Sequence, residues 1–296
     1  MSPDEGKPVN SLKALRILSV TSKICNMQTP EGAGNGGSQR PDTVSALERG
    51  ISVLRCFTET RRVLTSTELS RLPGVPRPTV TRLASTLVTL GLMQQEPEGD
   101  RYMLGPGVVS LARVFLAGLD VRAVARPRMQ ALAEAVGGSV YLAVPDGLDM
   151  VLIEACRPRS TMLAPRLDVG SRVPMANSAL GRAYLWALPR AERQALIESL
   201  RLARGSDWAA LEGGLQRTLA EADRLGYCIS AGDFHREINS VSVPLVGPSG
   251  EIMSLNCGTA AFIYPEEHLR QAIAPQLAQM AEALAADLGG HVPQPN

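Results

Sequence analysis

The chain has no hydrophobic run long enough to cross a bilayer, few aromatic residues and no closely spaced cysteine pair. A membrane-spanning helix needs about 20 apolar residues in a row, and no stretch of the 296 residues approaches that. The five cysteines are odd in number and lack any Cys-x-x-Cys pair, which argues against a disulfide framework and a zinc ribbon. Aromatic residues at 4% disfavour a stacking platform for single-stranded nucleic acid. We therefore expect a reduced, cytoplasmic protein that has no membrane partner and no signal peptide.

Net charge is also nearly absent, whereas hydrophobic residues are plentiful. A formal net charge of +1 excludes a globally basic protein that coats nucleic acid through bulk charge. The hydrophobic fraction of 45% is enough for packed cores, and 296 residues correspond to about two domains. All lysines lie within the first 23 residues, ahead of the glycine-rich stretch 31–41. This shift in composition predicts a flexible tail and linker over residues 1–42.

Residues 43–106 show the pattern of three helices followed by a hairpin. The first helix begins near Thr43 and is predicted from residues at helical spacing, namely Leu47, Gly50, Ile51, Leu54 and Phe57. The capping-box signature at 65–68 opens a second helix, and a third is predicted from Pro78 to Leu90. Two extended stretches then flank a turn at 97–100. This order is that of a winged helix-turn-helix, a DNA-binding fold.

The third helix suits the major groove of DNA because its outward face carries hydroxyls and arginines. Residues 76–90 contain no acidic side chain, so this face can approach phosphates and base edges without repulsion. The inner face is expected to be Val80, Leu83, Ala84 and Leu87. The alternative is a small helical domain that uses this helix for packing only. Our candidate DNA contacts, the last of them from the hairpin, are Arg77, Thr79, Thr81, Arg82, Ser85 and Arg101.

Beyond residue 106 the pattern changes to a single helix at 107–120 and then a mixed region at 121–289. Strand-like runs are grouped rather than strictly alternating with helices, which favours an α+β fold with an antiparallel sheet. Strands are expected at 139–144, 150–154, 227–230, 240–246 and 252–257. Helices are expected near 124–136, 178–187, 192–200, 211–225 and 266–288. Residues 290–296 are left as a tail.

Motifs in both halves resemble the IclR family of bacterial transcriptional regulators. In the first half, Leu69–Leu104 is similar through Thr79-Val80, Arg82-Leu83, Gly91-Leu92, Arg101-Tyr102 and Leu104-Gly105. In the second half, residues 173–183 (VPMANSALGRA) resemble the family's segment at the mouth of its effector pocket. The order of Gly226-Tyr227, Val243-Pro244-Leu245 and Gly250-Glu251 fits as well. The resemblance covers roughly residues 43–288.

This resemblance implies a ligand-responsive regulator, repressor or activator, and not an enzyme. It implies a winged helix-turn-helix joined by a linker helix to a GAF-like effector-binding domain. Its partners would be a double-stranded DNA operator, a small organic acid or aromatic metabolite as effector, and further copies of itself. Dimers would form through the DNA-binding half and could pair into tetramers. No cofactor is implied apart from the effector.

The resemblance also carries over candidate effector contacts. In relatives the backbone N–H groups of one helix start face the ligand, and a helix N-terminus suits an anion; here these residues are Ser178, Ala179, Leu180 and Gly181. Met162, Val173 and Ser240 fall where relatives place pocket walls, and Cys257 falls on the strand that closes the pocket. Arg182 replaces the family's lysine and keeps its charge.

The segment 230–240 departs from the family, which commonly carries an acidic pair here. Asp233, His235 and Glu237 would share one face if this segment were a strand, and together with Cys257 they could bind a transition metal. We favour instead a polar strand edge, or a pocket rim in which Asp233 and His235 hydrogen-bond a carboxylate ligand. No metal site is therefore predicted, and these residues remain weak candidates for one.

Two further classes of function deserve comparison with the sensor. Cys257 and His235 could form the thiol-imidazole pair of a hydrolase or thiol transferase, but no nucleophile-elbow or phosphate-loop string accompanies them. A redox sensor could use Cys56, Cys156 or Cys228 as its trigger, although Cys56 and Cys228, each beside apolar residues, fit a buried structural thiol better.

Overall fold

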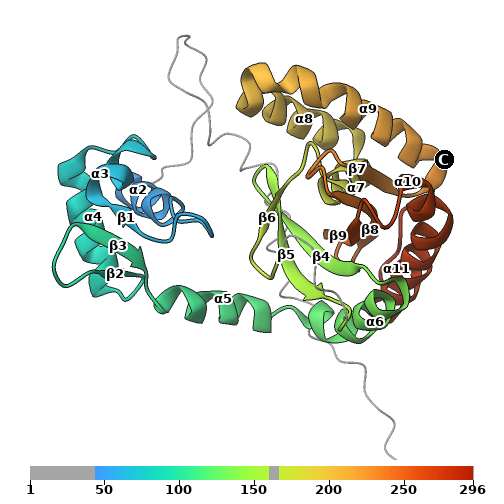
Figure 1. Ribbon diagram of the computed structural model, residues 1–296, viewed down its shortest axis with the longest axis horizontal. Coiled ribbons are helices and arrows are strands. Elements are labelled where there is room, and N and C mark those ends of the chain that lie inside the picture. The colour runs from blue at the N-terminus through green and yellow to red at the C-terminus, as the bar shows by residue number, and fades with distance from the viewer. Residues whose placement is uncertain (1–43, 160–166, 296) are drawn as a thin grey trace, which may run out of the picture. The chain divides into compact units, whose positions relative to one another are not determined.

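The computed structural model describes residues 44–159 and 167–295, and the chain divides into two compact units between Gly118 and Leu119 (Figure 1). The tail and linker predicted over residues 1–42, and the predicted pocket residue Met162, lie outside the described residues. Within the described part, no helix combines the length and hydropathy that a membrane span requires.

The first unit is a three-helix fold with a small antiparallel sheet. Its sheet has the strand order β1-β3-β2. Its elements in chain order are α2 (Ser45–Leu54), β1 (Leu64–Thr65), α3 (Ser66–Arg71), α4 (Arg77–Thr89), β2 (Met93–Gln95), β3 (Arg101–Leu104) and α5 (Gly107–Ala117). This is the predicted order of three helices, hairpin and further helix, with β1 as an addition. A two-residue strand is too short to show an alternating pattern, so only its pairing with Tyr102 on β3 reveals it.

Local sequence signals account for the helix boundaries of this unit. The Thr65 hydroxyl accepts a hydrogen bond from the Glu68 N–H at 3.3 Å, and the Glu68 carboxylate accepts one from the Thr65 N–H at 2.8 Å. This capping box starts α3 as the sequence predicted. After α4, Gly91 adopts a φ of +71°, a left-handed conformation that favours glycine and ends the helix.

The residues whose helical spacing predicted α2 are only partly buried. Gly50 and Val53 are buried against the rest of the unit, but Leu47 is 66% exposed and Ile51 is 41% exposed. Helical spacing shows which residues of α2 lie on its apolar side. It does not show that this apolar side is wider than the area that α2 buries against α4. Part of the apolar surface of α2 therefore faces solvent.

The second unit is built on a six-stranded antiparallel sheet in the order β6-β5-β4-β9-β8-β7. Its strands are β4 (Ser139–Asp146), β5 (Asp149–Cys156), β6 (Arg172–Pro174), β7 (Cys228–Ala231), β8 (Ile238–Val246) and β9 (Ile252–Ala260). Its helices are α6 (Asp120–Val136), α7 (Ala179–Ala187), α8 (Arg190–Arg204), α9 (Trp208–Leu225), α10 (Glu266–His268) and α11 (Ala274–Leu288). A short 3-10 turn at Gly205–Asp207 precedes α9, and a π segment at Leu269–Ile273 interrupts the predicted final helix.

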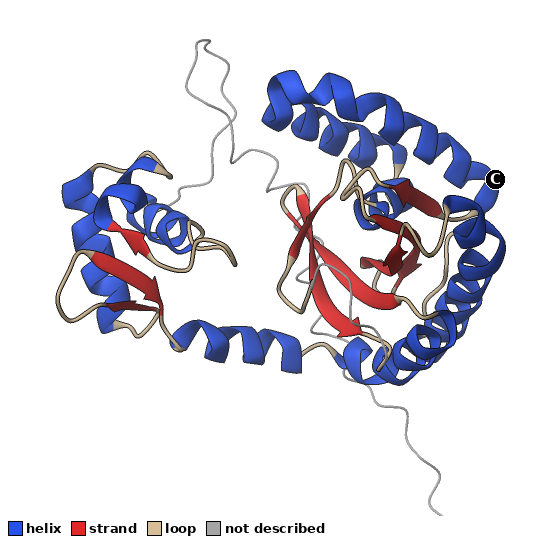
Figure 2. Cartoon of the chain, viewed as in Figure 1, coloured by secondary structure: helices blue, strands red, loops and turns tan. Residues whose placement is uncertain are grey.

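Helices cover both faces of this sheet (Figure 2). The helices α6 and α11 pack on each other and on β4, β5 and β8, whereas α7 packs on β8 and β9 and is backed by α9. Nearly every residue of β8 and β9 is buried, as expected when both faces of a strand are covered. The α+β fold with an antiparallel sheet, predicted from grouped strands, is confirmed. A core cluster of buried residues surrounds α7 and includes side chains from the sheet, α8 and α9.

Candidate functional site

Helix α4 presents a polar face to solvent while its apolar face packs in the core of the first unit. Val80, Ala84 and Leu87 are buried, and α4 contacts both α2 and α3. Thr79 is half-buried. The exposed residues of this face are Arg77, Thr81, Arg82, Ser85, Thr86 and Thr89. The predicted phase of the helix, apolar inward and hydroxyl and arginine outward, agrees with this arrangement.

The three candidate arginines of this unit differ in their partners. Arg77 forms an exposed ion pair with Asp100 at 3.5 Å, and Asp100 also accepts a hydrogen bond from the Ser66 hydroxyl at 2.7 Å. Arg77 is thus partly neutralised by the tip of the hairpin. Within the described parts of the chain Arg82 has no acidic partner, and Arg101 is exposed on β3. Arg82 is therefore the cation of α4 most available to a phosphate or a base edge.

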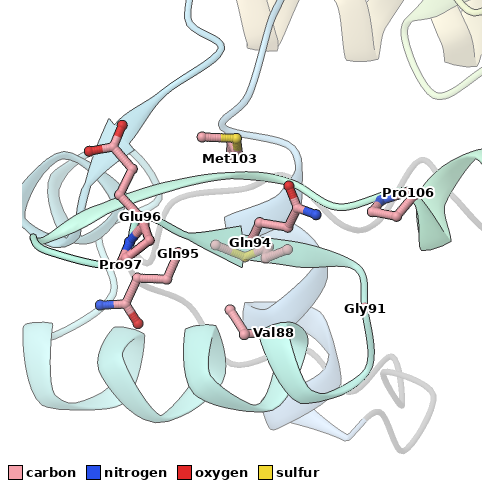
Figure 3. Close-up of a pocket in the computed structure, with 9 residues that line it drawn as sticks. Val88, Gly91, Gln94, Gln95, Glu96, Pro97, Met103 and Pro106 are labelled. Carbon is pink, nitrogen blue, oxygen red and sulfur yellow. The ribbon is translucent and has the colours of Figure 1, made fainter.

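The hairpin and α4 also enclose a hollow of about 540 Å³ (Figure 3). Val88 of α4 points toward β2 across this hollow. Glu96 and Pro97 lie at one end of the hollow and Pro106 lies at the other. Its rim includes the exposed residues Gln94, Gln95 and Pro97, so it opens to solvent and does not enclose a small molecule.

A more enclosed cavity lies in the second unit between the sheet and α7. With a volume of about 30 Å³ it holds about one water molecule, so a larger ligand requires the lining side chains to move. Its walls combine polar and apolar side chains, and none of the lining residues that the structure describes is charged. The lining residues are Ser139, Tyr141, Leu167, Val173, Leu180, Phe234, Ile238, Ser240, Asn256, Gly258 and Thr259.

The floor of this cavity is formed by small and polar side chains of three neighbouring strands, β4, β9 and β8. Residues that pair across these strands form rows. Antiparallel pairing sets Gly258 between Ser139 and Ser240, and sets Asn256 between Tyr141 and Ser242. The Asn256 amide nitrogen donates to the Val241 carbonyl at 3.1 Å and to the Ser242 hydroxyl at 2.8 Å. These two bonds fix the amide, so the carbonyl oxygen of Asn256 remains for other groups. At Gly258 the missing side chain leaves space, since a Cβ there would meet only atoms 3.6 Å or more away.

Three of the sequence-predicted effector residues line the cavity: Val173, Leu180 and Ser240. Ser178, Ala179 and Gly181 are buried at the start of α7 but do not line it. The Ser178 side chain caps the helix by accepting a hydrogen bond from the Gly181 N–H at 3.1 Å. A Cβ at Gly181 would lie 2.1 Å from the Met175 Cα, so close packing accounts for this glycine. Its N–H is consequently occupied by the cap rather than directed at a ligand.

The conditional arrangement that would place Asp233, His235 and Glu237 on one face does not occur, because the segment is a turn between β7 and β8 and not a strand. The Glu237 N–H donates to Nδ1 of His235 at 3.4 Å, and Asp233 accepts a bond from Arg182 at 2.6 Å. Among the described residues no group of three potential metal ligands comes together. Of this segment, Phe234 and Ile238 line the cavity instead.

Arg182 is buried and binds several elements together. Its side chain is 2% exposed and donates to the Ala176 carbonyl, the Thr218 hydroxyl and the Ile229 carbonyl, in addition to Asp233. These contacts join α7 to α9 and β7. The positive charge that Arg182 shares with the family's lysine is therefore buried in the fold. Asp233 is the counter-charge that compensates for its burial.

Cys257 was predicted to face the effector and instead points away from the cavity. Its neighbours Asn256 and Gly258 line the cavity, and successive residues of a strand face opposite sides. A Cβ at Gly138 would come 2.9 Å from the Cys257 sulfur, which is packed on the far face of the sheet. Burial raises the pKa of the Cys257 thiol to about 12. Neither Cys257 nor His235 lines the cavity, so the cavity holds no thiol-imidazole pair.

The other described cysteines are also buried. Burial is the largest cause that raises the pKa of the Cys56, Cys156 and Cys228 thiols, which disfavours the reactive thiolate. This arrangement matches the structural role that the sequence left as the alternative to a redox trigger.

Sequence reasoning missed most of the polar floor: Ser139, Tyr141, Asn256, Gly258 and Thr259. The available signal was an asparagine and a glycine in alternate positions of an otherwise apolar strand. That pattern marks a polar patch, but the pairing of β9 with β4 and β8 was needed to assemble it.

Comparison with known proteins follows the same division of the chain. The IclR helix-turn-helix domain matches residues 46–97, and the bacterial transcriptional regulator IclR C-terminal domain matches residues 114–286. The chain is 32% identical to the HTH-type transcriptional regulator TsaQ1/TsaQ2 of Comamonas testosteroni over 266 residues, 89% of this chain and 94% of that protein.

Solved structures agree with this match. An IclR family transcriptional regulator from Brucella abortus is 36% identical, with a TM-score of 0.79, over 90% of this chain and 98% of that one. An IclR homologue from Microbacterium hydrocarbonoxydans, complexed with 4-hydroxybenzoate, shares the fold at 22% identity and a TM-score of 0.62, over 82% and 97% of the two chains.

Proposed function

Because the chain belongs to the IclR family of bacterial transcriptional regulators, we propose that α4 contacts an operator and that the cavity of the second unit receives the effector. The chain is a DNA-binding regulator with a C-terminal effector-binding domain, and its relatives are named as regulators rather than enzymes. Such a regulator would work in the cytoplasm, where its DNA is found.

The proposal for DNA rests on the acid-free exposed face of α4. A helix in the major groove reads base edges with its outward side chains, while contacts to phosphates fix its position. We assign the outward contacts to Arg77, Thr79, Thr81, Arg82 and Ser85, and a contact of the hairpin to Arg101. Arg82 is the leading residue because it has no acidic partner among the described residues.

The proposal for the effector rests on the enclosed, uncharged cavity. A small site that is mostly apolar with a few polar groups suits a compact organic molecule. The Microbacterium homologue was solved with 4-hydroxybenzoate, and this supports a small organic acid or aromatic metabolite here. The cavity lining and its position between sheet and α7 provide the effector site without any further cofactor.

A second copy of the chain is the third partner we propose. No residue of α5 is buried, although much of the helix is apolar. Four of its large hydrophobic residues are 48 to 75% exposed, namely Val109, Leu111, Val114 and Phe115. An isolated helix of this length is marginal in water, so it needs a packing partner. On α2, Val44, Leu47 and Ile51 are exposed as well. We propose that these surfaces form a dimer that places one α4 on each half of a two-fold operator, and that dimers can pair further.

The test is selection of a binding site from random double-stranded DNA by the purified full-length protein, followed by titration of the enriched sequence. We expect Arg82→Ala to weaken specific binding by about 10- to 100-fold, the effect of one good base or phosphate contact. Arg224→Ala removes the same charge from an exposed position at the end of α9 and serves as the matched control.

The melting temperature of both variants should equal that of the parent protein. If no sequence is enriched, or if Arg82→Ala and Arg224→Ala bind equally well, α4 is not the reading helix. If Arg82→Ala unfolds the protein, the assigned phase of α4 is wrong.

A further inference from the structure

Among the described residues that line the cavity, none is charged, although the effector proposed above is an acid. A carboxylate that is buried without a counter-charge is strongly disfavoured. An acidic effector therefore needs a cation that reaches the cavity from immediately outside its lining. The position of that cation decides which end of the cavity holds the acid.

Arg157 lies at one end of the cavity floor. It directly follows Cys156, the last residue of β5, which pairs with Val140 next to Ser139. Both Arg157 and Ser139 act on the Tyr141 hydroxyl, so the Arg157 side chain reaches the part of the floor that carries these two residues.

Side-chain contacts keep the Arg157 guanidinium at this end. It donates a hydrogen bond to the carbonyl of Leu167, a lining residue, and lies 3.5 Å from the Asp168 carboxylate. Asp168 is 67% exposed, so its screening by water leaves the guanidinium only weakly neutralised. An incoming carboxylate can replace these two partners with a bidentate contact.

Tyr141 supplies a neutral donor beside this cation. Its side chain is 4% exposed, and burial, as the largest cause, raises the pKa of its hydroxyl despite the opposing effects of Ser139 and Arg157. The hydroxyl therefore keeps its proton at physiological pH and can donate it to a carboxylate. The Ser139 hydroxyl belongs to the residue two positions before Tyr141 on β4 and lies within reach of the Tyr141 hydroxyl.

The buried Arg182 does not provide a second cation for the cavity. Its guanidinium already binds Asp233 at 2.6 Å and three further acceptors. On the opposite side of Tyr141, Asn256 offers its carbonyl oxygen, which repels a second carboxylate. The remaining walls include the apolar residues Leu167, Val173, Leu180, Phe234 and Ile238.

We propose that the effector carries a single acidic group, which the Arg157 guanidinium and the Tyr141 hydroxyl hold at the Ser139 end of the cavity. The body of the effector is apolar and lies against the side chains of Val173, Leu180 and Phe234. This inference rests on the proposed role of the cavity as the effector site. It selects monoacids over diacids and over neutral amides of the same shape.

The experiment is a thermal-shift titration of the full-length protein, with apparent Kd values from the dependence of the melting temperature on ligand concentration. The probes are benzoate, phenylacetate and 4-hydroxybenzoate, their primary amides, and the diacids phthalate and terephthalate. We expect at least one monoacid to raise the melting temperature, and its amide and the diacids to have no effect at the same concentration.

Variants then identify the residues that hold the acid. Arg157→Gln is expected to weaken the binding of that monoacid by about 10- to 100-fold, as for the loss of a charge-assisted hydrogen bond. Arg159→Gln is the matched control, since Arg159 is 96% exposed and lies two residues further along. Tyr141→Phe should weaken binding about 10-fold, and Asp168→Asn should strengthen it because it removes a competing carboxylate.

Gly258→Val distinguishes failure of this inference from failure of the effector site itself. Its side chain would fill the cavity without a backbone clash, because the nearest atoms to a Cβ lie at 3.6 to 4.0 Å. Loss of binding in Gly258→Val together with full binding in Arg157→Gln would retain the cavity as the effector site and overturn the role of Arg157. Binding that survives Gly258→Val would overturn both. Binding by amides or diacids alone, or by none of the probes, would overturn the monoacid assignment.

Discussion

At the scale of single residues, the face of a strand decides which side chains can meet a ligand. Asn256 and Cys257 are adjacent in sequence, yet Asn256 lines the cavity and Cys257 packs against Gly138 behind the sheet. A thiol in that position is a core residue of the fold. The same residue type on the other face would have been a pocket residue, so the assignment depends on register and not on chemistry alone.

The pKa of Cys257 leads to a prediction about its reactivity. Alkylation requires the thiolate, and a pKa of about 12 keeps this thiol protonated far above neutral pH. We expect Cys257 and Cys228, whose pKa burial also raises, to resist iodoacetamide at pH 7.5 in the native protein and to react fully in urea. Peptide mapping by mass spectrometry measures both states. Rapid native labelling of either residue would restore a thiol-based sensor as a candidate.

At the scale of secondary-structure elements, α6 is attached to the sheet by a buried carboxylate. Glu154 of β5 is 2% exposed, and its two oxygens lie 3.2 Å from Arg122 and 2.7 Å from Arg126, both on α6. Removing the carboxylate charge would leave two arginines without their shared partner.

We therefore expect Glu154→Gln to lower the free energy of unfolding by about 2 kcal/mol. This is below the usual cost of breaking a buried pair, since Arg126 is 62% exposed and is screened by water. Glu134→Gln is the matched control because Glu134 is also an acid in contact with arginine, but its distance to Arg159 is 3.9 Å and both side chains are exposed. Urea denaturation measures both variants. Equal effects would show that Glu154 is not a structural anchor.

Elements with long, regular patterns could be predicted from the sequence, whereas those defined by distant partners could not. The capping box of α3 and the left-handed glycine after α4 are local signals, and both appear as expected. The strand β6 has three residues and is defined by its pairing with β5, so no local pattern marks it. The turn at 232–237 lies between two predicted strands, and its conformation keeps Asp233, His235 and Glu237 from gathering into a group of metal ligands.

The candidate site shows the same division. The exposed face of α4 followed from helical periodicity, since the position of each side chain depends on its own helix. The cavity floor combines β4, β8 and β9, whose paired residues are as far apart in sequence as Ser139 and Gly258, and its composition follows from their register. The burial of Arg182 depends on Asp233, 51 residues away, which no local signal indicates.

At the scale of the whole molecule, regulation requires that the effector and the operator favour different states of the same protein. By linkage, a factor by which the effector changes operator affinity is the factor by which the operator changes effector affinity. The two sites lie in separate units joined through α5 and Gly118. If a second copy of the chain packed against α5, the position of this helix would depend on the assembly. Both the effector and the operator could then favour one arrangement of α5 over another.

The exposed apolar surface of α5 provides the last prediction. Val114 is 75% exposed, and burying such side chains against a second copy would stabilise a dimer by roughly 1 to 2 kcal/mol each. We expect Val114→Glu to convert the dimer to a monomer in light scattering coupled to size-exclusion chromatography, and to weaken operator binding because two linked α4 helices bind more tightly than one. Leu202→Glu places the same charge on an exposed leucine of α8 and should keep the dimer. A monomeric parent protein, or a dimer that survives Val114→Glu, would remove α5 from the interface. Loss of the dimer only in Leu202→Glu would instead move the interface to the second unit.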